Sequence, residues 1–260
     1  TNKNSVTYLS PEFKKAMSVF RTFNYLLLPK TDIEEITNTK TDFLYISPSN
    51  TYPIGDIIKV KERNDLIKWA RSNNTYIIED DYNFFIRYNS YTIPSIHSYD
   101  NGENVIYMGS FAKMLIPSIR ISFMVLPVSL YNIYKDTYRK NSQGVSKLDQ
   151  LSLALFMKEG LFKRHTKKLY SQYKEKNEVI KKSLLKQSPN NSFTIQGSDS
   201  NLHLVLDFKT LKSLNQFTTN CENLSFEYKK IENKRSIIFP YSGIEINDIS
   251  KTIKKLLYKV

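Results

Sequence analysis

The chain has 260 residues, and at roughly 100 to 200 residues per domain this length allows one large domain or two smaller ones. A hydrophobic share of 40% is near the globular average and excludes wholesale disorder, coiled coil and collagen. The net charge of +13 favours anionic partners such as nucleic acid but identifies none, because a lysine-rich surface of biased composition explains it equally well.

Several classes of protein are excluded by what the sequence lacks. No apolar run approaches the ~20 residues that span a bilayer, and the start of the chain lacks the blocks of a signal peptide. A single Cys221 and three scattered histidines form no metal-ligand spacing, and the seven glycines form no Rossmann or P-loop pattern. We expect a soluble, cytoplasmic protein without a metal site.

The first 128 residues alternate helical patterns with short apolar runs. Such alternation is typical of a doubly wound α/β sheet, mainly parallel. In sheets of this kind, ligands bind beyond the carboxyl ends of the strands. The expected elements are helices over 11–22, 32–36 and 60–72, and strands over 25–29, 42–46, 75–78, 104–108 and 119–126.

The character of the sequence changes after residue 128. Residues 130–187 show no clear strand and predict long helices. Beyond them the pattern predicts strands over 203–208 and 236–239, with helices over 209–220 and 247–259. We therefore expect a large α/β domain over 1–128, then over 129–260 a helical linker and a smaller α+β domain.

Polar side chains follow three of the expected strands. Asn50 follows the first of these strands, Asp80 and Tyr82 the second, and Ser110 and Lys113 the third; Arg120 comes seven residues after the lysine. The acidic run at 79–81 alone is ambiguous, because carboxylates at a strand end bind Mg²⁺, act as general bases or lie in a solvated turn. Acid, phenol, lysine and arginine in this order can converge on one bound ring that carries a phosphate.

The sequence here resembles the fold-type-I pyridoxal-phosphate (PLP) aminotransferases. It is more closely similar to the aminotransferase-like domain of MocR-type transcription regulators in the GntR family. The resemblance is strong over residues 11–128 and thinner afterwards, and it implies a large PLP-binding domain with a mainly parallel sheet. The matching stretches are SPSNTYPIGDII at 47–58, YIIEDDYNFFIRY at 76–88, IPSIHSYD at 93–100 and NVIYMGSFAKMLIPSIRISFMVLP at 104–127.

The resemblance also implies roles for individual residues around the cofactor ring. Lys113 becomes the Schiff-base lysine. Asp80 would pair with the pyridine nitrogen and keep it protonated, since a carboxylate raises the pKa of a neighbouring base. Tyr82 and Asn50 would hydrogen-bond the ring's phenolic oxygen.

Ser110 and Arg120 are the residues that the resemblance assigns to the cofactor phosphate. Arg120 would bind it through a charge-assisted, bidentate pair. Two neighbours depart mildly from the family pattern: Ala112 replaces a small hydroxyl residue, and Ser118 replaces a glycine.

A larger departure concerns the arginine that binds the substrate α-carboxylate in the family's catalysts. Gly243 stands at its expected position, and Arg235 lies on the far side of the expected strand. Loss of a charge-assisted pair costs about 1.5 to 3 kcal/mol, which weakens amino-acid binding tenfold or more.

Three functional hypotheses follow. The favoured one is the PLP-binding effector domain of a MocR-type regulator, sensing PLP or an amine or amino acid. Such a protein would be a homodimer and would bind DNA through an N-terminal winged helix, so these 260 residues resemble a partial effector domain. The alternatives are an active aminotransferase and an unrelated α/β protein binding Mg²⁺ through Asp80 and Asp81.

Overall fold

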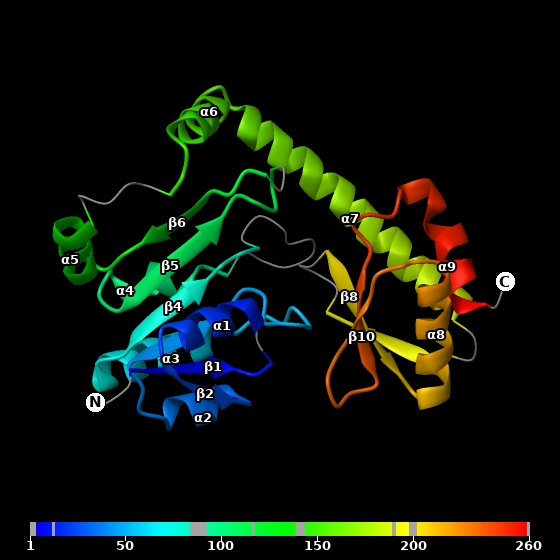
Figure 1. The fold of residues 1–260 in the computed structure, drawn as a ribbon, viewed down its shortest axis with the longest axis horizontal. Helices are drawn as coiled ribbons and strands as arrows, with labels where there is room; N and C mark the ends of the chain where they lie inside the picture. The colour runs from blue at the N-terminus through cyan, green and yellow to red at the C-terminus, as the bar shows by residue number, and fades with distance from the viewer. Residues whose placement is uncertain are drawn as a thin grey trace. The chain divides into compact units, whose positions relative to one another are not determined.

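The computed structural model describes residues 4–11, 14–83, 93–115, 118–138, 144–188, 191–197 and 202–258 (Figure 1). The described residues up to Lys163, apart from 53–55, form one compact unit. Those from Arg164 onward, together with 53–55, form the second. Within these ranges, no helix has the length and hydropathy needed to cross a membrane.

The first unit is built on a sheet whose order, within the described residues, is β2-β1-β3-β4-β5-β6. The first five strands are parallel to their neighbours, and β6 runs antiparallel to β5. The expectation of a mainly parallel sheet is thus confirmed. The strands are β1 (Ser5–Leu9), β2 (Leu26–Lys30), β3 (Phe43–Ile46), β4 (Tyr76–Asp80), β5 (Val105–Ser110) and β6 (Ser122–Val125).

Helices cover both faces of this sheet. On one face α1 (Lys14–Thr22) contributes Met17, which packs with Val6 and Tyr45. On the other face, buried side chains of three helices pack against apolar residues of β3, β4 and β5. These helices are α2 (Ile33–Thr37), α3 (Val60–Asn73) and α4 (Ile96–Asp100).

The end of α3 shows how the sequence sets the start of β4. Asn74 adopts a left-handed conformation with φ of 54°, which asparagine tolerates better than most residues. The chain therefore leaves the helix at Asn74, and Thr75 turns directly into the strand. Thr75 is fully buried, and its hydroxyl donates to the carbonyl of Thr41 at 2.6 Å.

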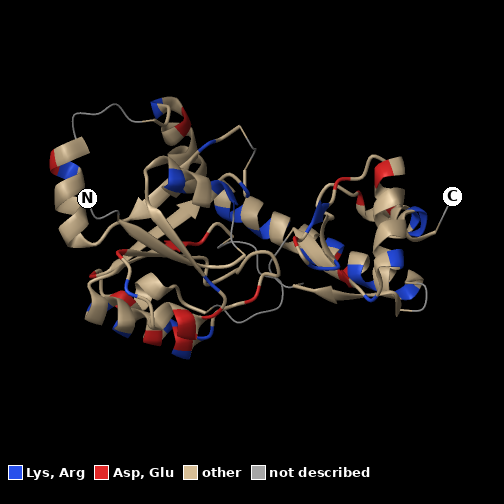
Figure 2. Ribbon diagram, turned by 60° about the horizontal axis from the view of Figure 1, so that its bottom comes forward, with Lys and Arg blue, Asp and Glu red and all other residues tan. Residues whose placement is uncertain are grey.

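Long helices follow β6, as the sequence predicts. They are α5 (Val128–Tyr138), α6 (Lys147–Lys158) and α7 (Leu161–Gln187). Lysines and arginines are spread over the helices of both units, and α7 carries several along its length (Figure 2). The positive charge is therefore distributed rather than confined to one element.

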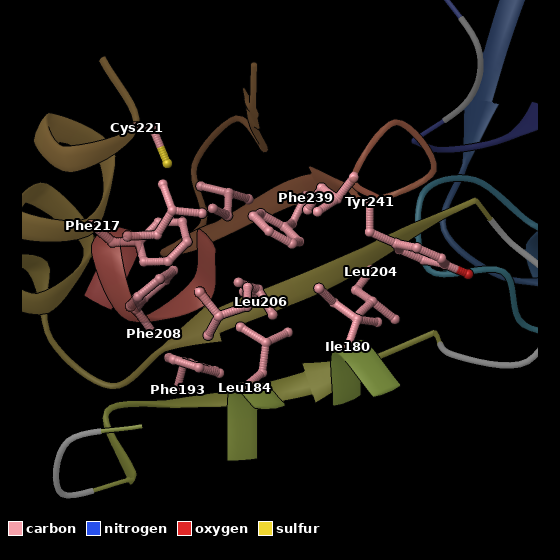
Figure 3. Packing of buried hydrophobic residues seen from close by; sticks show 14 of the residues in the cluster. Ile180, Leu184, Phe193, Leu204, Leu206, Phe208, Phe217, Cys221, Phe239 and Tyr241 are labelled. Atoms are coloured by element: carbon pink, nitrogen blue, oxygen red, sulfur yellow. The ribbon is translucent and has the colours of Figure 1, made fainter. Parts of the chain in front are cut away.

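The second unit has a sheet of order β7-β8-β10-β9, antiparallel throughout its described residues. Leu204, Leu206 and Phe208 alternate along β8 and share one face with Ile237 and Phe239 of β10. That face packs against α7, α8 and α9 in one apolar cluster (Figure 3). The elements are β7 (Phe193–Gln196), β8 (His203–Phe208), α8 (Leu211–Asn223), β9 (Lys229–Lys230), β10 (Ser236–Pro240), the 3₁₀ turn η2 (Ile246–Asp248) and α9 (Ile249–Leu257).

Among the described elements, the sequence patterns miss four: β1, α4, β7 and the two-residue β9. β1 lies between β2 and β3 in the sheet, and its sequence SVTYL forms no continuous apolar run. α4 has five residues, and a single turn carries no helical period. β7 has four residues, of which only Phe193 is buried, so no strong apolar run marks it.

Candidate functional site

The site lies where three parallel strands of the first unit end. Because β3, β4 and β5 are parallel, their carboxyl ends meet at one edge of the sheet. Asp80 is the last residue of β4 and Ser110 the last of β5, while Asn50 follows β3 in the loop that begins at Ser47. The structure therefore places these three residues at the same edge of the sheet, as the strand ends in the sequence predict.

The amine of Lys113 is held among residues that follow β4. Its Nζ donates to Asn83 Oδ1 at 3.0 Å and lies 4.2 Å from the centre of the Tyr82 ring. The residue as a whole is exposed to solvent, but its amine end packs against the Asn83 amide and the Tyr82 ring. This burial lowers the pKa of Lys113 to about 8, although the nearby Asp80 carboxylate opposes the shift.

Asp80 is the acidic partner in this arrangement. The Tyr45 hydroxyl donates to its Oδ2. Burial and the charge of Asp81 raise the pKa of Asp80, and the bond from Tyr45 and the positive charge of Lys113 lower it in part. The acid and the amine therefore interact electrostatically.

Tyr82 and Asn50 also meet at this edge, although through the backbone. The Tyr82 hydroxyl donates to the carbonyl oxygen of Asn50 at 3.1 Å. Asn50 itself is buried, with 2% of its surface exposed. The phenol that follows β4 is thus fixed to the loop that follows β3.

A buried arginine fixes the Asn50 loop. Arg63 of α3 has no exposed surface, and its guanidinium donates to three backbone carbonyls. The acceptors are Pro48 at 2.7 Å, Ile58 at 2.8 Å and Pro94 at 2.8 Å. Since Pro48 precedes Asn50 by two residues, α3 positions the loop through this one side chain.

Ser110 and Arg120 flank the Lys113 loop in the hairpin of β5 and β6. Ser110 pairs with Ser122, and Phe111 N–H donates to the Ile121 carbonyl at 3.0 Å, so the backbone of Arg120 lies across from the start of the loop. Arg120 is exposed and makes no hydrogen bond or ion pair with another described residue.

The three acidic residues at 79–81 have separate partners. Glu79 has no exposed surface and accepts from the amides of Ile96 at 2.9 Å and His97 at 2.8 Å. Asp81 accepts from the Tyr107 hydroxyl at 3.1 Å. Among the described residues, no group of three or more His, Cys, Asp or Glu side chains is arranged to hold a metal ion.

Sequence reasoning misses three residues that shape this site: Tyr45, Arg63 and Asn83. Tyr45 and Arg63 lie in a strand and a helix, where the pattern indicates only core and surface positions. Asn83 lies inside a matched stretch, directly after Tyr82, and this proximity to a predicted site residue was the one sequence signal that could have identified it. Residues 84–88 and 116–117, which belong to the matched stretches, lie outside the described residues.

Comparison with known proteins gives relatives along most of the chain, although no family model matches it. The chain is 29% identical over 265 residues to the HTH-type transcriptional regulator YdeL of Bacillus subtilis, covering 97% of the chain and 57% of YdeL. It is 31% identical over 230 residues to the regulator YhdI of the same organism, covering 86% and 49%.

A third relative is MocR of Rhizobium meliloti, whose name describes a regulatory protein of rhizopine catabolism. It is 27% identical over 231 residues, covering 86% of this chain and 47% of MocR. The chain is an aminotransferase-like domain of the MocR type. It spans about half the length of the curated relatives it matches.

Solved structures show the fold of this MocR-type domain. The α-aminoadipate aminotransferase LysN of Thermus thermophilus superposes with a TM-score of 0.83 at 18% identity, covering 98% of this chain and 70% of LysN. The kynurenine aminotransferase of Pyrococcus horikoshii superposes with a TM-score of 0.82 at 18% identity, covering 99% and 69%. The predicted fold-type-I architecture is therefore confirmed.

Gly243 lies in the second unit, in the turn after β10. A Cβ atom added there would meet nothing within 4 Å, so the turn leaves room for a side chain that this MocR-type domain lacks. Its neighbours are fixed: the Ser242 carbonyl accepts from Lys176 Nζ at 2.8 Å, and the Tyr241 hydroxyl accepts from Asn177 Nδ2 at 2.8 Å. Arg235 donates instead to the Lys209 carbonyl at 2.7 Å.

Proposed function

We propose that this chain is the PLP-binding effector domain of a transcription regulator, and that it senses its ligand rather than turning it over. The observation that carries the proposal is the Lys113 amine, bonded to Asn83, placed over Tyr82 and coupled to Asp80. An amine with a lowered pKa beside a carboxylate at a strand end is a combination that purely structural lysines rarely have.

The side chains present fit the cofactor's chemistry. Asp80 offers a carboxylate for the ring nitrogen. Tyr82 offers a phenol for the ring's oxygen substituent, and its hydroxyl is bonded to the backbone carbonyl of Asn50. Ser110 offers a hydroxyl for a phosphate, and the exposed Arg120, which has no partner among the described side chains, offers a guanidinium. Bound PLP supplies an electrophilic aldehyde on an electron-withdrawing ring.

The protein contributes by increasing the fraction of the Lys113 amine that is neutral near pH 7. With a pKa of about 8, about a tenth of the Lys113 side chains are neutral at pH 7, against fewer than one in a thousand for an ordinary lysine. Only the neutral form is nucleophilic, so burial of Lys113 accelerates capture of an aldehyde. Asp80 keeps a negative charge close to the amine and limits the shift.

The sensor role rests on Gly243. Family catalysts bind the substrate carboxylate through an arginine for which this sequence has a glycine, and the turn around it leaves the space open. PLP, or an amine without a carboxylate, therefore fits better than an amino acid. A sensor also requires that ligand binding favour one arrangement of the protein over another.

DNA and a second copy of the chain are the partners that we propose for the whole protein. The names of YdeL and YhdI describe helix-turn-helix regulators, and this chain covers 57% and 49% of them. DNA recognition would come from a helix-turn-helix region of the longer protein. A homodimer is proposed from the family resemblance.

The test is spectroscopic. Adding PLP to the protein, in the longest natural form that carries this chain, should produce an imine absorbance band. Lys113→Ala should abolish the band, while Lys135→Ala, on the exposed surface of α5, should leave it unchanged. Absence of the band in the parent protein would overturn the proposal.

A second assay separates the sensor from the alternative, an active aminotransferase. The PLP-loaded protein is mixed with an amino acid and 2-oxoglutarate, and keto-acid release is followed over many turnovers. The proposal predicts no turnover above the rate of free PLP. Steady release would show that the chain is a catalyst and that Gly243 does not prevent substrate binding.

A further inference from the structure

We infer that Asn83 is the positioning residue for the Lys113 amine, holding it at the strand ends through a neutral acceptor rather than a second carboxylate. The inference deepens the proposed function and rests on it. It concerns the protein before the cofactor arrives, when the amine must already be in place.

The geometry singles out Asn83. Its side chain is 4% exposed, and its Oδ1 accepts the hydrogen bond from Lys113 Nζ at 3.0 Å. The lysine is carried on the loop after β5, whereas Asn83 follows β4, so this bond joins the two strand ends. Met114, next to the lysine, is 2% exposed, so the loop is packed directly beyond Lys113.

Within the part of the chain that the structure describes, few charged or titratable groups surround the amine. Asp80 and Tyr82 face it from the end of β4, and Tyr45 of β3 acts on it through Asp80. Asp80 is thus the carboxylate that supplies negative charge at the amine. A second carboxylate at position 83 would favour the ammonium form strongly.

An amide oxygen is suited to the task because it accepts from both forms of the amine. Lys113 can lose its proton without losing the bond to Asn83, so the neutral nucleophile stays where the ammonium was. A carboxylate would anchor the lysine equally well but keep it protonated and unreactive. An apolar side chain would leave the ammonium without its acceptor and depress its pKa further.

The experiment measures Lys113 without any cofactor. The parent, Asn83→Asp and Asn83→Leu are treated briefly with an amine-acetylating reagent from pH 6 to pH 10, and acetylation of Lys113 is read by peptide mass spectrometry. The midpoint should lie near pH 8 in the parent, roughly one unit higher in Asn83→Asp and lower in Asn83→Leu. Asn132→Asp, the same charge change on exposed α5, should not move it.

Opposite shifts exclude a merely structural role. Unfolding would send the Lys113 midpoint toward the ordinary lysine value of about 10.4, the direction opposite to that expected for Asn83→Leu. Circular dichroism establishes that each variant is folded, and Asn83→Met replaces the leucine variant if that one does not fold. Equal midpoints in the parent and both folded variants would overturn the inference.

A PLP arm separates this inference from the proposed function. Asn83→Asp should capture PLP roughly tenfold more slowly than the parent at pH 7, and the difference should shrink near pH 9.5, where both amines are largely neutral. If the parent captures no PLP but the acetylation midpoints shift as stated, the proposed function fails and the role of Asn83 stands. If the parent captures PLP and the midpoints do not shift, only the inference fails.

Discussion

The two units differ in the charged side chains that they bury: among the described residues these all lie in the first unit, while the buried polar groups of the second unit, such as Asn177 and Asn220, are uncharged. The second unit packs three helices on one face of its sheet around a continuous apolar cluster. The first unit also has apolar layers, but along the carboxyl edge of its sheet it buries Arg63, Glu79, Asp81 and Asn83. Buried polar groups are costly unless each is hydrogen-bonded. In the proposed function, Lys113 and Asp80 of the first unit bind the ligand, and the apolar core of the second unit contributes stability.

The largest effect is expected in the apolar cluster. Phe239 of β10 has no exposed surface, and its ring contacts those of Phe217 and Phe226. Phe239→Ala should lower the free energy of unfolding by about 3 to 5 kcal/mol, because it removes buried surface and leaves a cavity. Leu211→Ala, at a residue 63% exposed, should change it by less than about 0.5 kcal/mol.

Urea unfolding followed by circular dichroism measures both variants. A loss below about 1 kcal/mol for Phe239→Ala would mean that the cluster repacks around the smaller side chain, and the contrast between the two units would then be weaker than the structure indicates.

An intermediate effect is expected from the buried acid of the first unit. Burial raises the pKa of Glu79 from 4.5 to about 7, although the amides of His97 and Ile96 oppose the shift. The folded state then binds more protons than the unfolded state between these values. The contribution of Glu79 to the free energy of unfolding is fully present below pH 4.5. It is lost as the pH rises toward 7 and beyond, by about 3 kcal/mol in total.

Glu79→Gln should remove this dependence. The parent should lose more unfolding free energy between pH 5 and pH 7.5 than the variant does, as measured by urea titration at both pH values. Glu34→Gln, on the exposed surface of α2, should retain the slope of the parent. Equal slopes in the parent and Glu79→Gln would show that Glu79 titrates in the ordinary range.

The smallest effect is expected at the bond between Tyr45 and Asp80. Tyr45→Phe removes the hydroxyl that stabilises the Asp80 anion, so the pKa of Asp80 should rise further. The cost should be about 1 kcal/mol at pH 7 and smaller in acid, where the carboxyl is protonated. Urea unfolding at the two pH values measures it, with Tyr134→Phe on exposed α5 as the control; an equal cost at both would argue against an ionised Asp80.

Much of the first unit could be predicted because strand ends carry a sequence signal. Strands 42–46, 75–78 and 104–108 were found within two residues of their observed ends, and their order along a parallel sheet brings Asp80, Tyr82 and Lys113 to one edge. Tyr45 could not be found in this way. Tyr45 reaches Asp80 because the register of β3 and β4 pairs it with Ile78, which lies two residues before Asp80 and on the same face. The sequence pattern of a single strand does not reveal its register with the neighbouring strand.

The alternation of β4 has a consequence for how the domain responds to its surroundings. Glu79 points toward the face covered by α4, and Asp80 points toward the face of Tyr45. Adjacent in the chain, the two carboxyls lie on opposite sides of one sheet, each with its own donors. Protonation of Glu79 and, in the proposed function, ligand binding at Asp80 would therefore act on opposite faces of the same strand.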